Sequence, residues 1–230
     1  MIEEPPPITF APSIERPPPK LVEQFRGIPS CFVIDAMGGA GALDWRIRGI
    51  IGGAFVGVAL TCDCAPSDNL AFMAAIDESE PGDVIVAATG GSTAAALTGD
   101  LLLGIARNRG VVGFVTDGLV RDIADLENLD LPVYAIGVTP NSPTRRGPGV
   151  VGGEIVCGGR AVASGDLILG DRDGVVVVPK ARIAATLEAL EGVKQIEAKM
   201  SALVRGGARV LPLPGLITRA SAAQAARRKP

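Results

Sequence analysis

GDLLLGIARNRGVVGFVTDGLVRD, residues 99–122, is the stretch from which both the fold and the candidate site are predicted. Gly99-Asp100 precedes an apolar run typical of a helix that ends at Gly110. The β-rich run 111–116 follows, and the stretch ends on Arg121-Asp122. A helix and a returning strand fit between the two pairs and would bring both pairs to the same end of a sheet. Two carboxylates, a guanidinium and a helix N-terminus would then converge, which favours a hard metal ion and a small carboxylate ligand.

Composition indicates one α/β domain with terminal extensions, since 230 residues are enough for a substantial core. Aromatic residues make up only 3%, so the core must be aliphatic. A net charge of −3 leaves no electrostatic footprint for nucleic acid. The apolar runs are interrupted by glycines and are too short to span a membrane. Prolines 5–7 stand where a signal peptide needs its apolar segment, which predicts a cytoplasmic protein.

The chain contains no histidine, which excludes Ser-His-Asp and Cys-His nucleophilic catalysis and any histidine-ligated metal. A general base must be a carboxylate, a lysine, Tyr134 or a metal-bound water. The cysteines show no CxxC spacing and predict no zinc site; we interpret them as small buried apolar residues. They are Cys31, Cys62, Cys64 and Cys157.

The chain is organised in three parts. Residues 1–20 hold seven of the eighteen prolines and predict an extended arm, disordered or lying on a neighbour. Residues 21–204 are predicted to form a single domain, and residues 205–230 a tail. Helices are predicted at residues 21–26, 70–76, 101–110, 123–129 and 180–204, and one more begins after Ser30. Ser30 is the predicted N-cap of that helix, and Ser67 or Asp68 is the predicted N-cap of the helix at 70–76. Strands are predicted at 47–64, at 84–88 with both faces buried, at 111–117 and at 132–136.

A polar loop is predicted over residues 137–153, and a β-rich segment follows it. Gly165-Asp166 and Asp173-Gly174 are hairpin signals within that segment. Arg145 and Arg146 are interpreted as residues of a solvated loop and are left out of the predicted site.

The two charged pairs at this spacing, followed by GDLILGDRDGVVVVP at residues 165–179, resemble the RraA-like family. The resemblance covers roughly residues 28–200. This family includes metal-dependent 4-hydroxy-4-methyl-2-oxoglutarate / 4-carboxy-4-hydroxy-2-oxoadipate aldolases, and also RraA, a non-catalytic protein inhibitor of a ribonuclease. The resemblance implies an α/β fold, a β/β/α sandwich like that of swivelling phosphohistidine domains. It also implies a homotrimer or homohexamer with sites between subunits.

The resemblance also implies roles for individual residues. Asp122 would ligate a divalent metal, Mg²⁺ or Mn²⁺, and Asp100 would hold this metal through water. Arg121 would contact the oxygen that becomes an enolate, and Asn69 would line the pocket. The backbone of Gly99, Asp100, Leu101 and Leu102 would receive the substrate carboxylate. Glu197 would be offered to the site of the neighbouring subunit.

These expectations describe a metal-dependent aldolase that cleaves a 4-hydroxy-2-oxo di- or tricarboxylic acid to pyruvate and a second oxo acid. Such cleavage leaves a pyruvate enolate, whose charge a metal and an arginine stabilise. Oxaloacetate decarboxylation is a second expected activity, because it passes through the same enolate. The alternative is a non-catalytic regulator that binds and inhibits a ribonuclease. The retention of Asp122 favours the enzyme.

Overall fold

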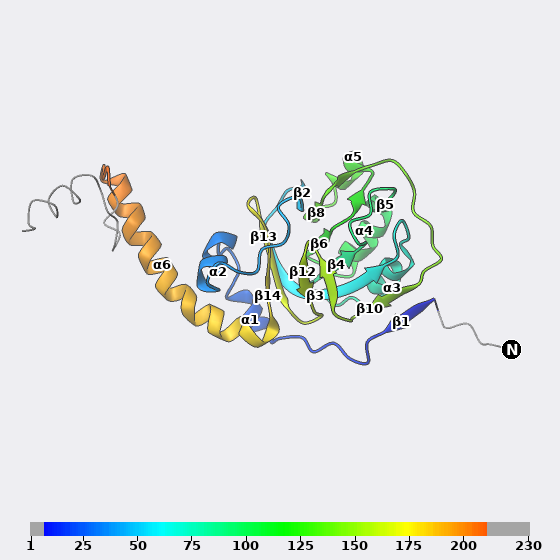
Figure 1. The fold of residues 1–230 in the computed structure, drawn as a ribbon, viewed down its shortest axis with the longest axis horizontal. Coiled ribbons are helices and arrows are strands. Elements are labelled where there is room, and N and C mark those ends of the chain that lie inside the picture. The colour runs from blue at the N-terminus through cyan, green and yellow to red at the C-terminus, as the bar shows by residue number, and fades with distance from the viewer. Residues whose placement is uncertain (1–6, 211–230) are drawn as a thin grey trace, which may run out of the picture. The chain divides into compact units, whose positions relative to one another are not determined.

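The computed structural model describes residues 7–210. The chain divides after Leu190 into two compact units. The first unit is an α/β domain, as predicted, and it contains every described strand (Figure 1). Within residues 7–210, no helix combines the length and the apolar character needed to cross a bilayer.

A nine-stranded sheet forms the centre of the first unit, in the order β1-β10-β3-β4-β6-β8-β2, with β13 paired to both β3 and β14. Strands β3, β4, β6 and β8 are parallel to one another. The strands of this sheet are β1 Ile8–Phe10, β2 Arg48–Ile51, β3 Phe55–Cys64, β4 Asp83–Ala88, β6 Gly113–Thr116, β8 Val133–Ala135, β10 Gly149–Val151, β13 Leu167–Asp171 and β14 Gly174–Val178. Two smaller sheets consist of β5 Ala96–Thr98, β7 Leu119–Val120 and β9 Gly137–Val138, and of β11 Ile155–Cys157 with β12 Arg160–Val162.

Strand β4 is buried along its whole length, as its unbroken apolar sequence predicts. Ile85 and Ala87 pack in the cluster formed with the helices α3 Leu70–Glu78, α4 Asp100–Asn108 and α5 Ile123–Leu126. Val84 and Val86 pack on the opposite face, against β11–β12 and the β13–β14 hairpin. The sheet is therefore covered by helices on one side and by β-structure on the other, which is the β/β/α layering that was predicted.

A third apolar cluster lies where β13 and β14 meet the remaining helices. These helices are α1 Pro19–Glu23, α2 Ser30–Ala36 and the start of α6 Ile183–Arg205, which follows the 3₁₀ turn Lys180–Arg182. Ser30 is the first residue of α2, and Pro29, not Ser30 as predicted, is its N-cap. The reason is that Asp171 accepts hydrogen bonds from both the N–H and the hydroxyl of Ser30 (2.7 and 2.8 Å), so the serine side chain is already used.

Several predictions for the second half of the domain are wrong in detail. The segment 137–153 is not only loop, because β9 and β10 lie within it and pair with β7 and β3. Gly165-Asp166 is not a hairpin turn; it links β12 to β13, and Asp166 instead accepts the N–H groups of Ala163 and Lys180. The true β11–β12 turn is Gly158-Gly159, whose positive φ angles suit a two-residue hairpin. Cys31 is exposed on α2, whereas the other three cysteines are buried, as expected.

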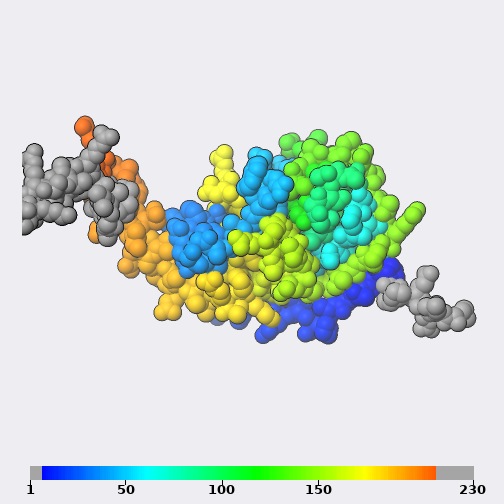
Figure 2. All heavy atoms as spheres, viewed as in Figure 1, coloured from blue at the N-terminus to red at the C-terminus, as the bar shows by residue number. Residues whose placement is uncertain are grey.

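The proline-rich arm lies on its own chain. β1 pairs with β10 in parallel, with Ile8 opposite Gly149, and Figure 2 shows this dark blue segment lying along the surface of the first unit. Further along the arm, the Arg16 guanidinium makes a bidentate pair with Asp83 (Nε–Oδ1 3.0 Å, Nη2–Oδ2 2.8 Å). The expectation of a disordered arm or one lying on a neighbour is therefore wrong for its described part, because a strand partner and a buried carboxylate hold it in place.

Arg16→Ala is expected to lower the free energy of unfolding by about 3 kcal/mol, because it leaves the buried Asp83 carboxylate without its charged partner. Urea unfolding measures this loss. Arg26→Ala is the matched control, since the Arg26–Glu23 pair is exposed at both ends and its removal should leave the midpoint unchanged. Equal losses in the two variants would contradict the anchoring role of Arg16.

Candidate active site

The predicted site residues come together where three short parallel strands end. β5, β7 and β9 form one sheet, and their carboxyl ends lead into Gly99-Asp100, Arg121-Asp122 and the loop 139–148. A pocket of about 140 Å³ lies at this edge. Its walls are formed by Asn69, Thr98, Gly99, Asp100, Leu101, Leu102, Arg121, Asp122, Pro143 and Arg145.

The strand that leads into Arg121-Asp122 is not the strand that the sequence predicts. Residues 113–116 of the predicted run form β6 in the large sheet, and the Arg-Asp pair follows the two-residue strand β7 in the small one. β5, which precedes the Gly-Asp pair, was not predicted at all. The two pairs still meet, because β5 and β7 are adjacent and parallel, with Thr98 opposite Val120.

The Gly-Asp and Arg-Asp pairs approach each other closely at Gly99. A Cβ atom built on Gly99 would overlap Asp122 Oδ2 and lie 3.0 Å from Arg121 Cγ. The φ of Gly99 is −145°, an extended conformation that any residue adopts. Glycine is therefore needed here for space and not for backbone conformation.

Asp122 holds a left-handed backbone conformation, with φ 61° and ψ 43°. This region costs a residue with a side chain about 1 kcal/mol, and aspartate and asparagine tolerate it better than most. Asp122 is the N-cap position of α5, and its carbonyl accepts the N–H of Asp125 (3.1 Å). Strained residues of this kind concentrate at functional sites. In this conformation the Asp122 carboxylate lies against Gly99.

Arg121 is fixed by three contacts. Its backbone N–H donates to Thr98 O (3.1 Å), which ties β7 to β5. Its Nε donates to Asp122 Oδ2 (3.1 Å), and its Nη1 donates to Ser142 Oγ in the loop after β9 (2.6 Å). The guanidinium is one-third exposed, so it lies at the pocket wall with donors left for a ligand.

Helix α4 begins at the pocket. Gly99 is its N-cap, Asp100 lies in its first turn, and the Leu103 N–H bonds to Gly99 O (3.2 Å). The first N–H groups of a helix have no partner within it and carry a partial positive charge. The backbone of Gly99 to Leu102 therefore presents donors suited to a small anion.

Asn69 contributes a buried and unsatisfied acceptor. The residue is 2% exposed, lines the pocket, and its Oδ1 has no hydrogen-bond partner. A buried amide oxygen without a partner costs free energy. A ligand that brings a donor to this atom would remove that cost.

Arg145 is exposed in a loop, in agreement with its interpretation as a solvated loop residue, but it also lines the pocket from which that interpretation left it out. No sequence signal marks it, because its position depends on how the loop 139–148 folds back against residues 67–69. Arg146 does not line the pocket. Glu197 lies half-buried on α6 in the second unit, and its predicted place in a neighbouring subunit's site stays a prediction.

The donor set at the pocket suits a hard, hydrated cation. Within residues 7–210, no cluster of three or more His, Cys, Asp or Glu side chains could hold a metal. Mg²⁺ needs no such cluster, since it is commonly held by one or two carboxylates and keeps several waters. The carboxylates of Asp122 and Asp100 fit this mode, and an all-oxygen set does not favour zinc.

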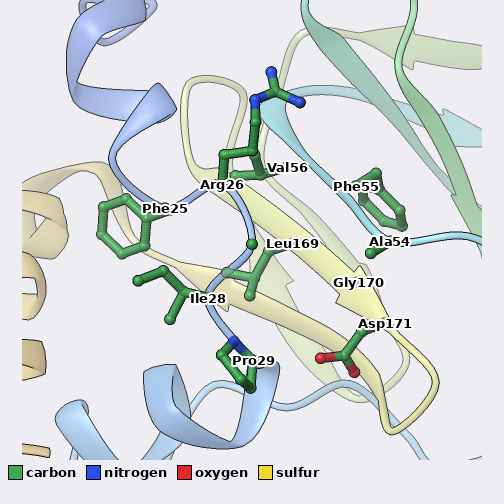
Figure 3. Close-up of a pocket in the computed structure, with 11 residues that line it drawn as sticks. Phe25, Arg26, Ile28, Pro29, Ala54, Phe55, Val56, Leu169, Gly170 and Asp171 are labelled. Carbon is green, nitrogen blue, oxygen red and sulfur yellow. The ribbon is translucent and has the colours of Figure 1, made fainter. Parts of the chain in front are cut away.

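A larger pocket, of about 440 Å³, lies elsewhere in the domain between the α1–α2 connection and β3 and β13. Figure 3 shows that its wall is largely apolar, with Phe25, Ile28 and Leu169 clustered together, and that the Arg26 guanidinium points away from them. The carboxylate in this wall, that of Asp171, already accepts hydrogen bonds from the N–H and the hydroxyl of Ser30. The smaller pocket is therefore the candidate active site, because it holds the convergent charged and polar groups.

Comparison with known proteins agrees with this architecture. A relative from Halalkalibacterium halodurans, named putative 4-hydroxy-4-methyl-2-oxoglutarate aldolase, is 41% identical over 160 residues, which are 69% of this chain and 76% of the relative. The solved structure of Streptomyces coelicolor RraAS2, described as an unusual member of the RNase ES inhibitor RraA protein family, aligns with a TM-score of 0.73 and 26% identity, covering 81% of this chain and 99% of that one. The RNA-processing inhibitor RraA from Thermus thermophilis aligns with a TM-score of 0.62 and 27% identity, covering 66% and 93%.

A family model described as Aldolase/RraA matches residues 30–177, a range that includes both charged pairs, Asn69 and Arg145. Because this match covers more than half of the chain, and the relative and the solved structures agree with it, the chain belongs to the RraA-like family.

Proposed function

We propose that this protein is a divalent-metal-dependent aldolase that cleaves a 4-hydroxy-2-oxo di- or tricarboxylic acid to pyruvate and a second oxo acid. Oxaloacetate decarboxylation is proposed as a second activity of the same pocket. The relative named putative 4-hydroxy-4-methyl-2-oxoglutarate aldolase supports the reaction class.

One observation carries the proposal: the Asp122 carboxylate and the Arg121 guanidinium lie together against the N-terminus of α4 in a single pocket. A 2-oxo acid offers a carboxylate and an adjacent carbonyl. The backbone N–H groups of α4 suit its carboxylate, and the guanidinium suits the carbonyl oxygen.

The chain's own residues can assist cleavage between C3 and C4. The negative charge that develops on the C2 oxygen is met by Arg121, which its contacts to Asp122 and Ser142 hold in place before the reaction. Such a preorganised donor contributes about 3–4 kcal/mol to the transition state. Asn69 Oδ1, which has no hydrogen-bond partner in the structure, is proposed to accept a hydrogen bond from the C4 hydroxyl. A water held by Arg121 is the proposed proton carrier, since the chain has no histidine. It takes the proton that the C4 hydroxyl loses as the C3–C4 bond breaks, and returns a proton to C3 of the enolate to give pyruvate.

Asp122, with Asp100 acting through water, would hold the metal. When bound, a divalent metal would supply Lewis-acid polarisation of the 2-oxo group. We also propose that the protein forms a homotrimer or homohexamer in the cytoplasm. In this assembly, Glu197 of a neighbouring subunit would lie at the site.

Pyruvate release that depends on added metal is the expected result. Purified protein should release pyruvate from a 4-hydroxy-2-oxo diacid. A coupled assay with lactate dehydrogenase measures this pyruvate. EDTA should abolish the release, and Mg²⁺ or Mn²⁺ should restore it. A panel of such acids together with oxaloacetate, assayed with and without Mg²⁺, separates aldolase from decarboxylase activity. Purifying and identifying the second product, the oxo acid released together with pyruvate, shows which carbon–carbon bond was cleaved.

If no acid in the panel gives pyruvate with metal supplied, the aldolase proposal fails. The result would then favour the alternative, a non-catalytic regulator, for which two solved neighbours described as RNase inhibitors or RNA-processing inhibitors provide the precedent. The family match alone does not separate these two functions.

A further inference from the structure

Asp68 is a buried carboxylate beside the pocket whose role the proposed reaction leaves unexplained. It is 3% exposed and does not line the pocket. Its Oδ2 accepts hydrogen bonds from Thr144 Oγ1 (2.7 Å) and the Arg146 N–H (2.5 Å). Its Oδ1 accepts the N–H groups of Leu70 (3.0 Å) and Gly147 (3.1 Å).

These contacts tie two distant segments together. Asp68 and Thr144 form a parallel β-bridge, the Asn69 N–H donates to Thr144 O (3.0 Å), and the Thr144 N–H donates to Ser67 O (2.8 Å). Arg145 lies between two residues that both bond to Asp68, and Asn69 follows Asp68 directly in the chain. One carboxylate thus bonds to residues that adjoin both pocket-lining residues in the chain, Leu70 beside Asn69, and Thr144 and Arg146 beside Arg145.

Only an ionised carboxylate satisfies this arrangement. All four groups that face Asp68 are donors, and an ionised carboxylate accepts without donating. Desolvation raises the pKa of Asp68, but the backbone bonds from Arg146, Leu70 and Gly147 and the bond from the Thr144 hydroxyl outweigh it and lower the pKa overall. Asp68 is therefore charged throughout the neutral range, whereas an asparagine would turn an NH₂ group toward one pair of donors.

We propose that Asp68 is a positioning residue that fixes the turn 144–147, so that Arg145 faces the pocket and gives it a preference for oxo acids with a second carboxylate. The inference rests on the proposed function for its substrate class. Arg145 is the group with the right chemistry for the distal carboxylate, because the proposed reaction already uses the guanidinium of Arg121 at the C2 oxygen.

The test compares two ligands that differ in one group. 2-Oxoglutarate and 2-oxopentanoate have the same five-carbon 2-oxo acid skeleton, and one ends in a carboxylate where the other ends in a methyl group. Calorimetric titration in the presence of Mg²⁺ gives the ratio of the two Kd values without turnover. Wild-type protein should favour 2-oxoglutarate. Asp68→Asn should reduce this ratio about five- to tenfold, as expected for losing a charge-assisted hydrogen bond at a partly exposed site, while the Kd for 2-oxopentanoate changes less than about twofold.

Asp166→Asn is the matched control. Asp166 is buried like Asp68 and also accepts backbone N–H groups, two in place of three, but those belong to Ala163 and Lys180, which do not line the pocket. Its substitution should lower thermal stability and leave the ratio unchanged. Trypsin gives a second readout, since cleavage after Arg145 or Arg146 should accelerate in Asp68→Asn and not in Asp166→Asn.

A double-mutant cycle shows whether Asp68 acts through Arg145. Arg145→Met should lower the ratio by the same factor, and the double variant Asp68→Asn/Arg145→Met should lower it no further. An unchanged ratio in Asp68→Asn, independent effects in the double variant, or a wild-type ratio near one would each overturn the proposal. These outcomes are separate from failure of the proposed function: if wild-type protein releases no pyruvate but the ratios behave as described, the positioning role stands and the aldolase activity does not.

Discussion

Asp122→Asn is expected to lower kcat/KM for pyruvate release on the order of 10³-fold while the protein stays folded. Asparagine has the same shape and tolerates the left-handed conformation that Asp122 holds (φ 61°). It lacks the negative charge proposed to hold the metal and to orient the Nε of Arg121 (3.1 Å). The measurement is a steady-state assay at saturating Mg²⁺, with circular dichroism and urea unfolding to establish that the fold is retained.

Asp130 provides a matched control for backbone strain. It also has a positive φ (50°), is exposed, and does not line the candidate site. Asp122→Ala and Asp130→Ala should each lose about 1 kcal/mol of stability, because alanine pays the steric cost of the left-handed region. Only the change at Asp122 should abolish activity. If Asp122→Asn keeps more than a tenth of the wild-type kcat/KM, the carboxylate is not the group on which the reaction depends.

The elements that could be predicted from the sequence are those with a strong local signal. β4 was predicted from an apolar run without alternation, and α4 from the apolar run that begins after Gly99 and ends near Gly110. The sequence also predicts that the two charged pairs meet, but it predicts the wrong connection. The chain returns through β6 of the large sheet and then β7 of the small sheet, and the pairs meet because β7 pairs with β5.

The parts that were not predicted depend on partners far away in the sequence. β5 and β7 have three and two residues, too few for a periodic pattern, and they are strands only because they pair with each other and with β9. Arg145 reaches the pocket only because Asp68 holds the turn around it. The proline-rich arm reads as unstructured from composition, and its order comes from β10 and Asp83.

Gly99→Ala is expected to destroy the candidate site from the backbone side. The added Cβ would overlap Asp122 Oδ2 and crowd Arg121 Cγ, so the carboxylate, the guanidinium or the start of α4 must move. Displacements of about 1 Å at reacting groups cost on the order of 10²-fold in rate. Forcing the extra atom into packed surroundings should also cost about 1–3 kcal/mol of stability. Activity assays and urea unfolding measure the two effects.

Gly104→Ala is the control on the same helix. A Cβ at Gly104 would make an ordinary contact with Leu129 Cδ2 at 3.7 Å, and Gly104 does not line the pocket. Alanine in place of a helical glycine should stabilise the protein by up to about 1 kcal/mol, and the catalytic rate should stay at the wild-type level. The two substitutions add the same methyl group to α4 or its cap, and only the one at the cap meets Asp122. Wild-type activity in Gly99→Ala would mean that the close approach of the two charged pairs is incidental, and the proposed site would have to be abandoned.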